Sequence, residues 1–338
     1  MDKMRLGRTG IATGRSGFGA IPIQRISAGE ATALLRKAYE GGIDFFDTAR
    51  SYTDSEEKIG LALSELRGRL FIATKTPALD GKALRADLEA SLRLLRTDYI
   101  DVYQLHNPAF VPRPGDGTGL YEALEEAKRA GKIRFIGITN HRLAVAREAL
   151  ESGLYDTLQF PLSSLSSEED LALARSARER DVGFIAMKAL AGGVLTNAAS
   201  AFAFLRSVEG VLPIWGIERQ DQLAEFLALE ANPPALDGAM REIIERDRAE
   251  LSGSFCRGCG YCLPCPAGIE INMAARMTYL MRRSRFELYA TPEWRAKMER
   301  IEGCTLCGGC RKKCPYGLDT PALLRSQLAE YRRMVGRV

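Results

Sequence analysis

Long apolar runs are missing from this 338-residue sequence. No stretch approaches the roughly 18 residues that a bilayer-spanning helix requires. Residues 1–8 also lack the apolar core of a signal peptide. A strong excess of one charge is missing as well, because 47 Lys and Arg face 43 Asp and Glu. These absences argue against a membrane-spanning protein and give no support to nucleic-acid binding. We therefore expect a cytoplasmic protein that acts on a small molecule.

Cysteine is absent before position 256, and all eight cysteines lie between Cys256 and Cys314 in two groups of four. In a cytosolic chain, tight groups of cysteines indicate metal rather than disulfides. The same region is basic: residues 255–338 hold 15 Lys and Arg against 7 Asp and Glu, a net charge of +8 that leaves −4 for the rest. We expect an acidic main domain followed by a small basic domain that binds metal.

Strand and helix patterns alternate through the first two thirds of the chain. After a short hairpin at 4–15, eight segments have the composition of strands: 16–23, 43–47, 70–75, 99–106, 133–139, 157–160, 182–187 and 211–215. The helical segments that follow them are 28–40, 56–67, 83–95, 120–130, 144–152, 168–180, 199–205 and 221–229. Eight such units predict an α/β fold with a closed (β/α)8 TIM barrel. A doubly wound open sheet is the alternative, but no Gly-x-Gly-x-x-Gly follows the first strand.

Polar residues stand where three predicted strands end: Asp47, Lys75 and His106, with Tyr52 shortly after the first. Such side chains are costly to bury unless they pair, and the strand ends of a barrel converge. A Lys75 cation held by Asp47 would lower the pKa of Tyr52 from about 10, so that Tyr52 can protonate a developing alkoxide. His106 would orient a carbonyl. Taken singly, each residue can also be a solvated charge at the barrel rim, but four in this order favour a site that needs a hydride donor.

Four motifs occur in order along the chain, and the first three contain the four polar residues just described. They are Asp47-Thr-Ala-x-x-Tyr52-x-x-Ser-Glu56, Thr74-Lys75, Leu105-His106 and Gly131-Lys-Ile-Arg-Phe-Ile-Gly-Ile-Thr-Asn140. In these motifs the sequence resembles the aldo-keto reductases, from about Met4 to Leu229. The resemblance implies an NAD(P)H-dependent carbonyl reductase. It also implies that Tyr52 is the general acid and base, and that Asp47, Lys75 and His106 complete a catalytic tetrad.

The resemblance further implies where the nucleotide binds. The implied residues are Gly19, Ala20, Asp47, Thr139, Asn140, Gln159, Lys188, Ala189, Leu190, Gly192, Gly216, Arg219, Gln222 and Glu225. In this scheme Thr139, Asn140 and Gln159 hold the carboxamide of nicotinamide. Residues 188–193 pass the pyrophosphate, and residues 216–225 hold the adenosine end.

At the adenosine end the sequence departs from the family pattern. Gly and Ile occupy 216–217 in place of a Lys-Ser pair, Gln222 replaces an Arg, and Phe226 replaces an Asn. Arg219 can still pair with a phosphate, whereas Glu218 suits a free ribose hydroxyl. The choice between NAD and NADP therefore stays open.

The cysteines follow the spacing Cys256-x2-Cys259-x2-Cys262-x2-Cys265-Pro and Cys304-x2-Cys307-x2-Cys310-x3-Cys314-Pro. In two-cluster ferredoxins the fourth cysteine of each run ligates the other cluster. The pattern implies one [4Fe-4S] cluster on Cys256, Cys259, Cys262 and Cys314, and a second on Cys304, Cys307, Cys310 and Cys265. The x2 spacing before Cys265 departs from the usual x3. Two structural zinc sites are the alternative.

Between the two cysteine runs, residues 273–288 and 292–302 predict helices, so the region resembles the α-helical ferredoxin modules of multidomain redox enzymes. We expect three parts: a barrel at 1–232, a linker helix at 233–253 and a ferredoxin-like iron-sulfur domain at 254–338. The basic run Arg311-Lys-Lys313 has three interpretations: it neutralises clusters, docks an acidic electron carrier protein, or faces solvent.

The leading hypothesis is an iron-sulfur aldo-keto reductase with a carbonyl or alcohol substrate that the sequence does not identify. Nicotinamide passes two electrons as hydride, clusters pass one at a time, and no flavin signature is visible. The clusters therefore serve either electron transfer or structure. The alternative hypothesis is a nucleotide-binding redox sensor or electron-transfer subunit without carbonyl turnover.

Overall fold

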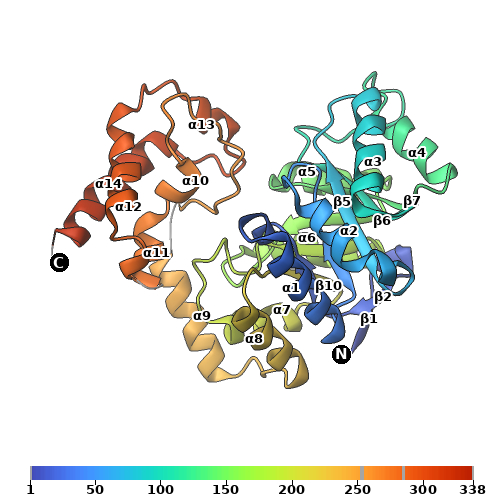
Figure 1. Cartoon of the computed structure of the whole chain (residues 1–338), viewed down its shortest axis with the longest axis horizontal. Coiled ribbons are helices and arrows are strands. Elements are labelled where there is room, and N and C mark those ends of the chain that lie inside the picture. The colour runs from blue at the N-terminus through green and yellow to red at the C-terminus, as the bar shows by residue number, and fades with distance from the viewer. Residues whose placement is uncertain (1, 252–254, 284–285, 337–338) are drawn as a thin grey trace. The chain divides into compact units, whose positions relative to one another are not determined.

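A computed structural model describes residues 2–251, 255–283 and 286–336 of the chain (Figure 1). The chain divides into two compact units: Met1–Ala189 with Ala198–Arg241, and Leu190–Asn197 with Glu242–Val338. The segment Leu190–Asn197 thus interrupts the first unit in sequence but packs with the second. The expected boundary at 253 and 254, and residues 284 and 285 of an expected helix, lie outside the described residues.

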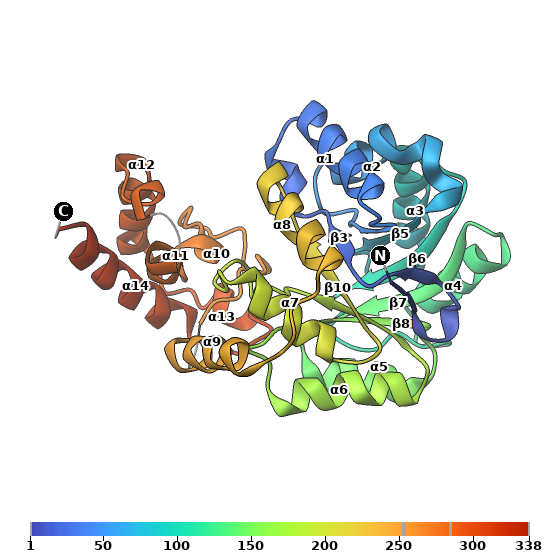
Figure 2. The same ribbon diagram turned by 90° about the horizontal axis from the view of Figure 1, so that it is seen from below.

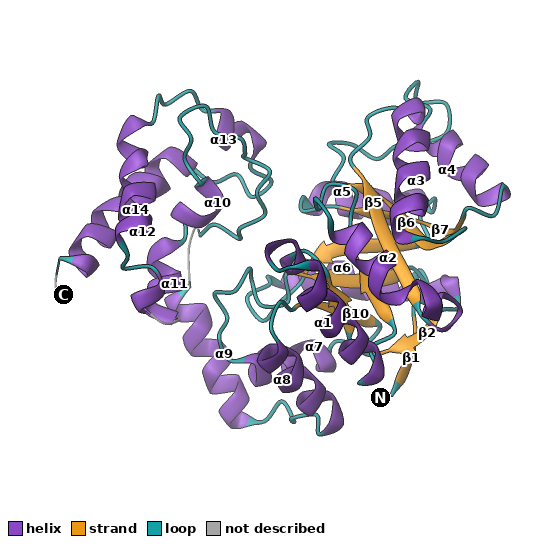
Figure 3. Cartoon of the chain, viewed as in Figure 1, coloured by secondary structure: helices purple, strands orange, loops and turns teal. Residues whose placement is uncertain are grey.

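Eight parallel strands of the first unit close into a barrel, as the alternating pattern predicts (Figures 2 and 3). Their order around the barrel is β10-β3-β4-β5-β6-β7-β8-β9, so β10 closes the barrel on β3. The strands are β3 (Gly17–Gly19), β4 (Phe45–Asp47), β5 (Phe71–Thr76), β6 (Ile100–His106), β7 (Ile133–Thr139), β8 (Thr157–Pro161), β9 (Gly183–Met187) and β10 (Val211–Gly216).

The helices that alternate with the strands are α1 (Ala28–Glu40), α2 (Ser55–Leu63), α3 (Gly81–Leu95), α4 (Leu120–Arg129), α5 (Leu143–Ser152), α6 (Glu168–Glu179), α7 (Ala198–Ser207) and α8 (Gln220–Ala231). Helix α1 has the predicted bounds for a local reason. The Ser27 hydroxyl accepts the N–H of Glu30, while the Glu30 carboxylate accepts the N–H of Ser27. This reciprocal cap fixes the start of the helix, and its apolar face packs inward.

The first hairpin packs against the starts of the strands. Strand β1 (Lys3–Arg5) pairs antiparallel with β2 (Ala12–Gly14). Leu6, at the turn between them, is buried in one apolar cluster with Phe45, Val102 and Leu212. Because Phe45 begins β4 and Asp47 ends it, apolar contacts occupy the early part of the strand and leave its carboxyl end for polar groups.

Two predicted elements of the barrel are shorter than expected. The first strand pairs only over Gly17–Gly19, and Pro22–Arg25 forms a 3-10 helix (η2), because Pro22 has no N–H to donate to a strand ladder. The helix expected at 56–67 ends at Leu63 and continues as a 3-10 helix, Ser64–Arg69 (η3). This tighter turn places the Arg67 guanidinium 2.7 Å from Asp101.

The described residues of the second unit form helices and loops and contain no strand (Figure 3). Helix α9 (Gly238–Glu250) begins in the first unit and continues into the second. The helices that follow are α10 (Ile271–Ala274), α11 (Met277–Arg283), α12 (Pro292–Glu299), α13 (Gly309–Lys313) and α14 (Thr320–Val335), with 3-10 turns η4 (Phe286–Leu288) and η5 (Arg300–Gly303). The core of the second unit includes Met277, Met298, Leu328 and Tyr331. No helix in the described ranges is long and apolar enough to cross a membrane.

The prediction of one continuous helix from residue 273 to 288 is wrong. The chain turns between α10 and α11, where the Arg276 N–H donates to the carbonyl of Met273, three residues back. The Asn272 carbonyl, which a continuous helix would pair with that N–H, instead accepts the side-chain Nε of Arg276 at 2.9 Å. The side chain of Arg276 thus replaces a helical hydrogen bond.

Helix α14 was not anticipated from the sequence. Its signals are present: the Asp319 side chain caps the N–H of Ala322 at 3.3 Å, and Pro321 stands in the first turn. Leu324, Leu328 and Tyr331 then recur at helical spacing and are buried.

Candidate functional site

Three of the predicted polar residues lie at neighbouring strand ends. Asp47 ends β4, Lys75 lies one residue before the end of β5, and His106 ends β6. Lys75 Nζ donates to Asp47 Oδ2 over 2.6 Å and to the Thr48 carbonyl over 2.5 Å. Only 2% of Asp47 and 1% of Lys75 are exposed. The carboxyl end of the barrel therefore holds a buried ion pair.

Burial and pairing act in opposite directions on this pair. Burial raises the pKa of Asp47 and lowers the pKa of Lys75, because each charge loses its hydration. The opposite charge and the hydrogen bond between the two residues offset part of that cost. Two amides also donate to the carboxylate: Gln159 Nε2 lies 3.3 Å from Oδ2, and Gln104 Nε2 lies 3.4 Å from Oδ1. These donors favour the ionised form of Asp47.

Gln104 is a site residue that the sequence analysis missed. Its side chain is fully buried, and on β6 it shares the inward face with Val102 and His106. A large polar side chain on the inner face of a strand, two residues before a histidine, is the signal in the sequence. It places an amide beside Asp47.

Tyr52 and His106 meet at the same end of the barrel. Their ring centres are 5.8 Å apart in an edge-to-face arrangement, and Lys75 Nζ lies 5.1 Å from the centre of the Tyr52 ring. The Ser51 hydroxyl lies 3.2 Å from His106 Nδ1. Burial, followed by the positive charges of Lys75 and Lys188, lowers the pKa of His106 to about 3. The imidazole is therefore neutral at physiological pH. The structure brings together all four residues of the predicted tetrad.

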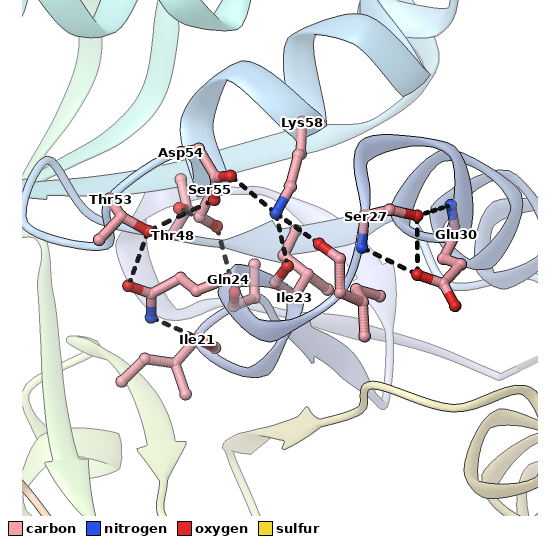
Figure 4. Close-up of polar contacts among 12 residues, drawn as sticks. Ile21, Ile23, Gln24, Ser27, Glu30, Thr48, Thr53, Asp54, Ser55 and Lys58 are labelled. Atoms are coloured by element: carbon pink, nitrogen blue, oxygen red, sulfur yellow. Dashed lines mark hydrogen bonds and ion pairs between the residues drawn. The ribbon is translucent and has the colours of Figure 1, made fainter.

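The loop that carries Tyr52 is anchored by a buried lysine (Figure 4). Lys58 on α2 is 4% exposed. Its Nζ donates to the carbonyls of Ile23 and Ile26 over 2.9 and 2.7 Å and pairs with Asp54 at 2.8 Å. Lys58 thus joins the segment after β3 to the loop just beyond Tyr52.

Hydroxyl groups form a second anchor for the same loop. The Thr48 hydroxyl donates to Ser55 Oγ over 2.9 Å, and Ser55 Oγ donates to the Ala20 carbonyl over 3.1 Å. The Thr53 hydroxyl donates to Gln24 Oε1 over 3.1 Å (Figure 4). The loop is therefore held from both sides, which limits how far the Tyr52 ring can shift.

Several residues implied to bind nucleotide lie at the same strand ends. Gly19 stands opposite both Asp47 and Gly216 in the barrel ladder. The Ala20 N–H donates to the Asp47 carbonyl over 2.9 Å. Gly19, Ala20 and Gly216 therefore lie next to the buried ion pair.

The three residues implied to hold a carboxamide are also brought together. Thr139 stands opposite both His106 and Gln159 in the ladder, and Asn140 N–H donates to the Gln159 carbonyl over 3.0 Å. The Asn140 side chain is used locally, because its Nδ2 donates to the Pro108 carbonyl over 2.8 Å. Gln159 Oε1, by contrast, is buried and has no hydrogen-bond partner among the described residues.

The segment after β9 is divided between the two units. Lys188 and Ala189 belong to the first unit, and the charge of Lys188 acts on His106. Leu190 and Gly192 belong to the second unit. The structure thus brings Lys188 to the site, while the residues that follow pack with the cysteine-rich region.

At the expected adenosine end, polar side chains form hydrogen bonds and an ion pair at the start of helix α8 itself. Gln222 Oε1 accepts the N–H groups of Glu218 and Arg219 over 3.1 and 3.2 Å. Arg219 pairs with Asp221 at 2.9 Å on the exposed surface, and Glu225 is also exposed.

Phe226 contributes to the core instead of the surface. It is 3% exposed and stacks on Trp215 with ring centres 4.5 Å apart. Of the residues that depart from the family pattern, Phe226 therefore has a packing role and is not available to a nucleotide.

The eight cysteines line two cavities in the second unit. Cys256, Cys259, Cys262 and Cys314 line one, which we call the first cysteine site. Cys265, Cys304, Cys307 and Cys310 line the other, the second cysteine site, of about 230 Å³, with Cys262 between the two. All eight thiols are free of disulfides. Apart from Cys262, the two linings divide the cysteines in the crossed way that the ferredoxin pattern implies, and the ligand sets themselves stay a prediction.

The two sites differ in exposure and charge. At the first site, burial raises the pKa of Cys262 to about 12. Burial also raises the pKa of Cys256, against the opposing effects of the Gly258 N–H and the Arg276 cation. At the second site Cys307 is exposed, and the Gly309 N–H lowers its pKa. The first site is therefore partly buried, and the second reaches solvent at Cys307.

Two family models match the chain. The Aldo/keto reductase family matches residues 10–230, and a 4Fe-4S dicluster domain matches residues 255–319. Among curated proteins, L-galactose dehydrogenase of Arabidopsis thaliana is 31% identical over 211 residues, which are 57% of this chain and 66% of that protein. Aldo-keto reductase YhdN of Bacillus subtilis is 33% identical over 217 residues, 58% of this chain and 64% of that protein. The chain thus spans slightly less than two thirds of these relatives.

A solved structure gives the same fold. An aldo-keto reductase from Klebsiella pneumoniae, in complex with NADPH, is 25% identical with a TM-score of 0.63. The match covers 72% of this chain and 94% of that one.

Proposed function

The chain belongs to the aldo/keto reductase family, and from this premise we propose that it transfers hydride between NADPH or NADH and a carbonyl or alcohol substrate, with Tyr52 as general acid and base. The buried ion pair of Lys75 and Asp47, 2.6 Å apart and beside the Tyr52 ring, is the observation that carries this proposal. A charge pair is costly to bury, and this one lies where a proton donor needs a fixed cation.

Each residue of the tetrad has a distinct role in this proposal. Tyr52 gives its hydroxyl proton to the oxygen of the reduced carbonyl. Lys75 stabilises the negative charge left on the Tyr52 oxygen, and Asp47 holds Lys75 in place. His106 is neutral, so it hydrogen-bonds the substrate oxygen without competing as an acid.

The residues around the tetrad fit a nicotinamide nucleotide, which supplies or accepts the hydride when bound. Buried Gln159 Oε1 lacks a partner among the described residues, and an acceptor of this kind suits the N–H of a carboxamide. At the adenosine end Gln222 is used as a cap and Phe226 is buried. The Arg219 guanidinium pairs with Asp221 on the surface, and an exposed ion pair is weak enough to exchange for a phosphate.

We also propose two [4Fe-4S] clusters, on Cys256, Cys259, Cys262 and Cys314 and on Cys265, Cys304, Cys307 and Cys310. Clusters of this type pass one electron at a time. In support, each set of four thiols lines its own cavity. Structural zinc remains the competing occupant, and counting iron and sulfide distinguishes the two.

The exposed side of the second cysteine site suits an acidic electron carrier protein. Leu306 is 62% exposed next to Cys307, and Arg311, Lys312 and Lys313 are exposed on and around α13. Lys313 also lines the cavity of this site. An apolar centre with a positive rim is typical of a surface that binds an acidic partner. This surface also favours the second candidate function, an electron-transfer subunit without carbonyl turnover.

One experiment tests both candidates. The protein is purified without oxygen, iron and sulfide are counted, and NADPH and NADH are titrated by fluorescence and cluster absorbance. A panel of aldehydes and ketones is then assayed for nucleotide oxidation. Binding with turnover supports the reductase; binding without turnover on any carbonyl supports the electron-transfer subunit. Failure to bind either nucleotide contradicts both.

A further inference from the structure

The segment that follows β9 has an unusual backbone conformation that the surrounding packing must maintain. Lys188, Ala191 and Gly192 have φ of +59°, +49° and +75°. Left-handed conformations are uncommon for residues other than glycine and persist where packing fixes them. The segment starts at Lys188, whose charge reaches His106, and continues as Leu190–Asn197 in the second unit. It is therefore a covalent connection between the candidate active site and the cysteine-rich unit.

Arg276 holds this segment. Its Nη1 donates to the Gly192 carbonyl, its Nε to the Asn272 carbonyl over 2.9 Å, and its Nη2 to Met273 Sδ over 3.3 Å. The residue is 9% exposed. A Cβ on Gly192 would lie 2.7 Å from Arg276 Nη1 and equally close to the Arg257 carbonyl. The close approach of the guanidinium therefore requires glycine at position 192.

The same guanidinium also faces the first cysteine site. A Cβ on Gly258 would lie 2.7 Å from Arg276 Cζ, and the Gly258 N–H donates to Cys256 Sγ over 3.4 Å. Arginine keeps its charge when buried and offers several donors in one rigid plane. The Arg276 cation thus donates to the Gly192 carbonyl and also acts on the Cys256 thiol.

We propose that Arg276 is a positioning residue through which the charge of the first cysteine site sets the conformation of Leu190–Asn197, so that nucleotide binding and the redox state of this site are coupled. This inference rests on the proposed function, which assigns nucleotide to the barrel and a cluster to this site. Such coupling is reciprocal: reduction of the site changes the nucleotide affinity by the same factor by which bound nucleotide changes the equilibrium constant for reduction.

The sign of the coupling follows from charge. One added electron makes the first cysteine site more negative, which draws the Arg276 guanidinium toward Cys256 and weakens its bond to Gly192. Release of Gly192 loosens the segment after β9, which weakens nucleotide binding to the reduced protein, so bound nucleotide lowers the midpoint potential of the first cluster.

A redox titration of the whole protein tests the coupling. Reduction by dithionite is followed by electron paramagnetic resonance, with and without saturating NADPH or NADH. The signal that disappears in Cys259→Ser belongs to the first cluster. We expect the oxidised protein to bind nucleotide at least about fivefold more tightly, a shift of about 40 mV at 59 mV per decade. An unmoved midpoint with nucleotide bound overturns this inference and leaves the proposed function intact; absence of nucleotide binding overturns both.

Two glycines provide a matched pair of variants. Gly192→Ala places a Cβ against Arg276, whereas Gly193 also has a positive φ, +95°, but nothing lies within 4 Å of its Cβ position. Both substitutions strain the backbone, but only the Cβ of Gly192→Ala meets Arg276. Only Gly192→Ala should therefore abolish the potential shift. Gly193→Ala should keep the shift even where it weakens binding overall. A shift that survives Gly192→Ala would show that the coupling does not pass through this contact.

Arg276→Lys tests the guanidinium itself, because it keeps the charge and loses the planar fork. We expect normal iron and sulfide content with the nucleotide-dependent shift lost. The control is Arg282→Lys on α11, where the side chain is 55% exposed and pairs with Glu330. A shift that is equal in Arg276→Lys and Arg282→Lys would contradict the role of Arg276.

Discussion

Lys75 Nζ and Asp47 Oδ2 lie 2.6 Å apart with almost no access to water. Neither charge is stable there without the other, because burial alone drives both toward their neutral forms. The pair is therefore a fixed cation and anion beside Tyr52, and removal of either partner leaves an uncompensated buried charge.

Removing one partner should therefore reduce stability as well as activity. We expect Lys75→Met to cost about 3–5 kcal/mol in free energy of unfolding, because it leaves the buried Asp47 charge uncompensated. Chemical denaturation measures this cost. Lys132→Met is the control: its exposed pair with Glu89 should contribute about 1 kcal/mol or less. Equal costs for the two variants would show that the Asp47 pair is not buried in solution.

Tyr52→Phe should remove carbonyl reduction but not the fold. Loss of a general acid lowers turnover by about 10²–10⁴-fold, whereas the ring contacts with His106 and Lys75 are kept. Steady-state kinetics and nucleotide fluorescence measure the two effects separately. Tyr39→Phe, on α1 away from the site, serves as the control. Full turnover by Tyr52→Phe would rule out its role as the acid.

His106 should not titrate near neutral pH. Its pKa of about 3 lies below the unfolded value of about 6.5, so between these values the unfolded chain binds a proton that the folded chain does not. The His106 contribution to stability is therefore unfavourable in acid, and stability rises with pH across this window. The sequence has two histidines, so comparison with His106→Gln assigns the ring signals in a nuclear magnetic resonance titration. A His106 midpoint near pH 6.5 would contradict the half-buried, neutral imidazole.

Lys58 should support turnover without touching substrate. We expect Lys58→Met to release the carbonyls of Ile23 and Ile26 and to loosen the Tyr52 loop. A displacement of about 1 Å in a catalytic group can cost about 10²-fold, so kcat should fall more than nucleotide affinity. Lys37→Met, on the exposed side of α1, is the control. A variant that loses nucleotide binding and turnover equally would indicate a general loss of structure instead.

Charge reversal beside the second cysteine site should slow reduction by an acidic carrier. The double variant Lys312→Glu with Lys313→Glu removes the positive rim next to exposed Leu306. We expect a lower association rate with a weaker salt dependence, measured by stopped-flow with an acidic ferredoxin. Arg295→Glu with Arg300→Glu, at two other exposed positions, makes the same change in net charge and is the control. Equal rates in the two double variants would exclude this surface as the docking site.

The barrel and the tetrad were accessible from the sequence because their signals are local. Strand ends at Asp47 and His106 follow from short apolar runs, and the cap at Ser27 is visible in four consecutive residues. The turn at Arg276 was not accessible, because the local pattern fits a continuous helix. The deciding contact is with Gly192, 84 residues earlier in the chain. Gln104 was overlooked for a similar reason: its role depends on Asp47, which lies on a strand two positions away in the barrel.

The crossed grouping of the cysteines has a consequence for how this part of the chain becomes ordered. Cys314 lines the cavity of the first run, and Cys265 lines the cavity of the second. Each cavity is thus completed by a thiol from the far end of the same long segment. Closing either cavity already fixes the ends of that segment, so the entropy of loop closure is lost once for the two sites together. Closing one cavity therefore lowers the entropic cost of closing the other, which couples the ordering of the two sites.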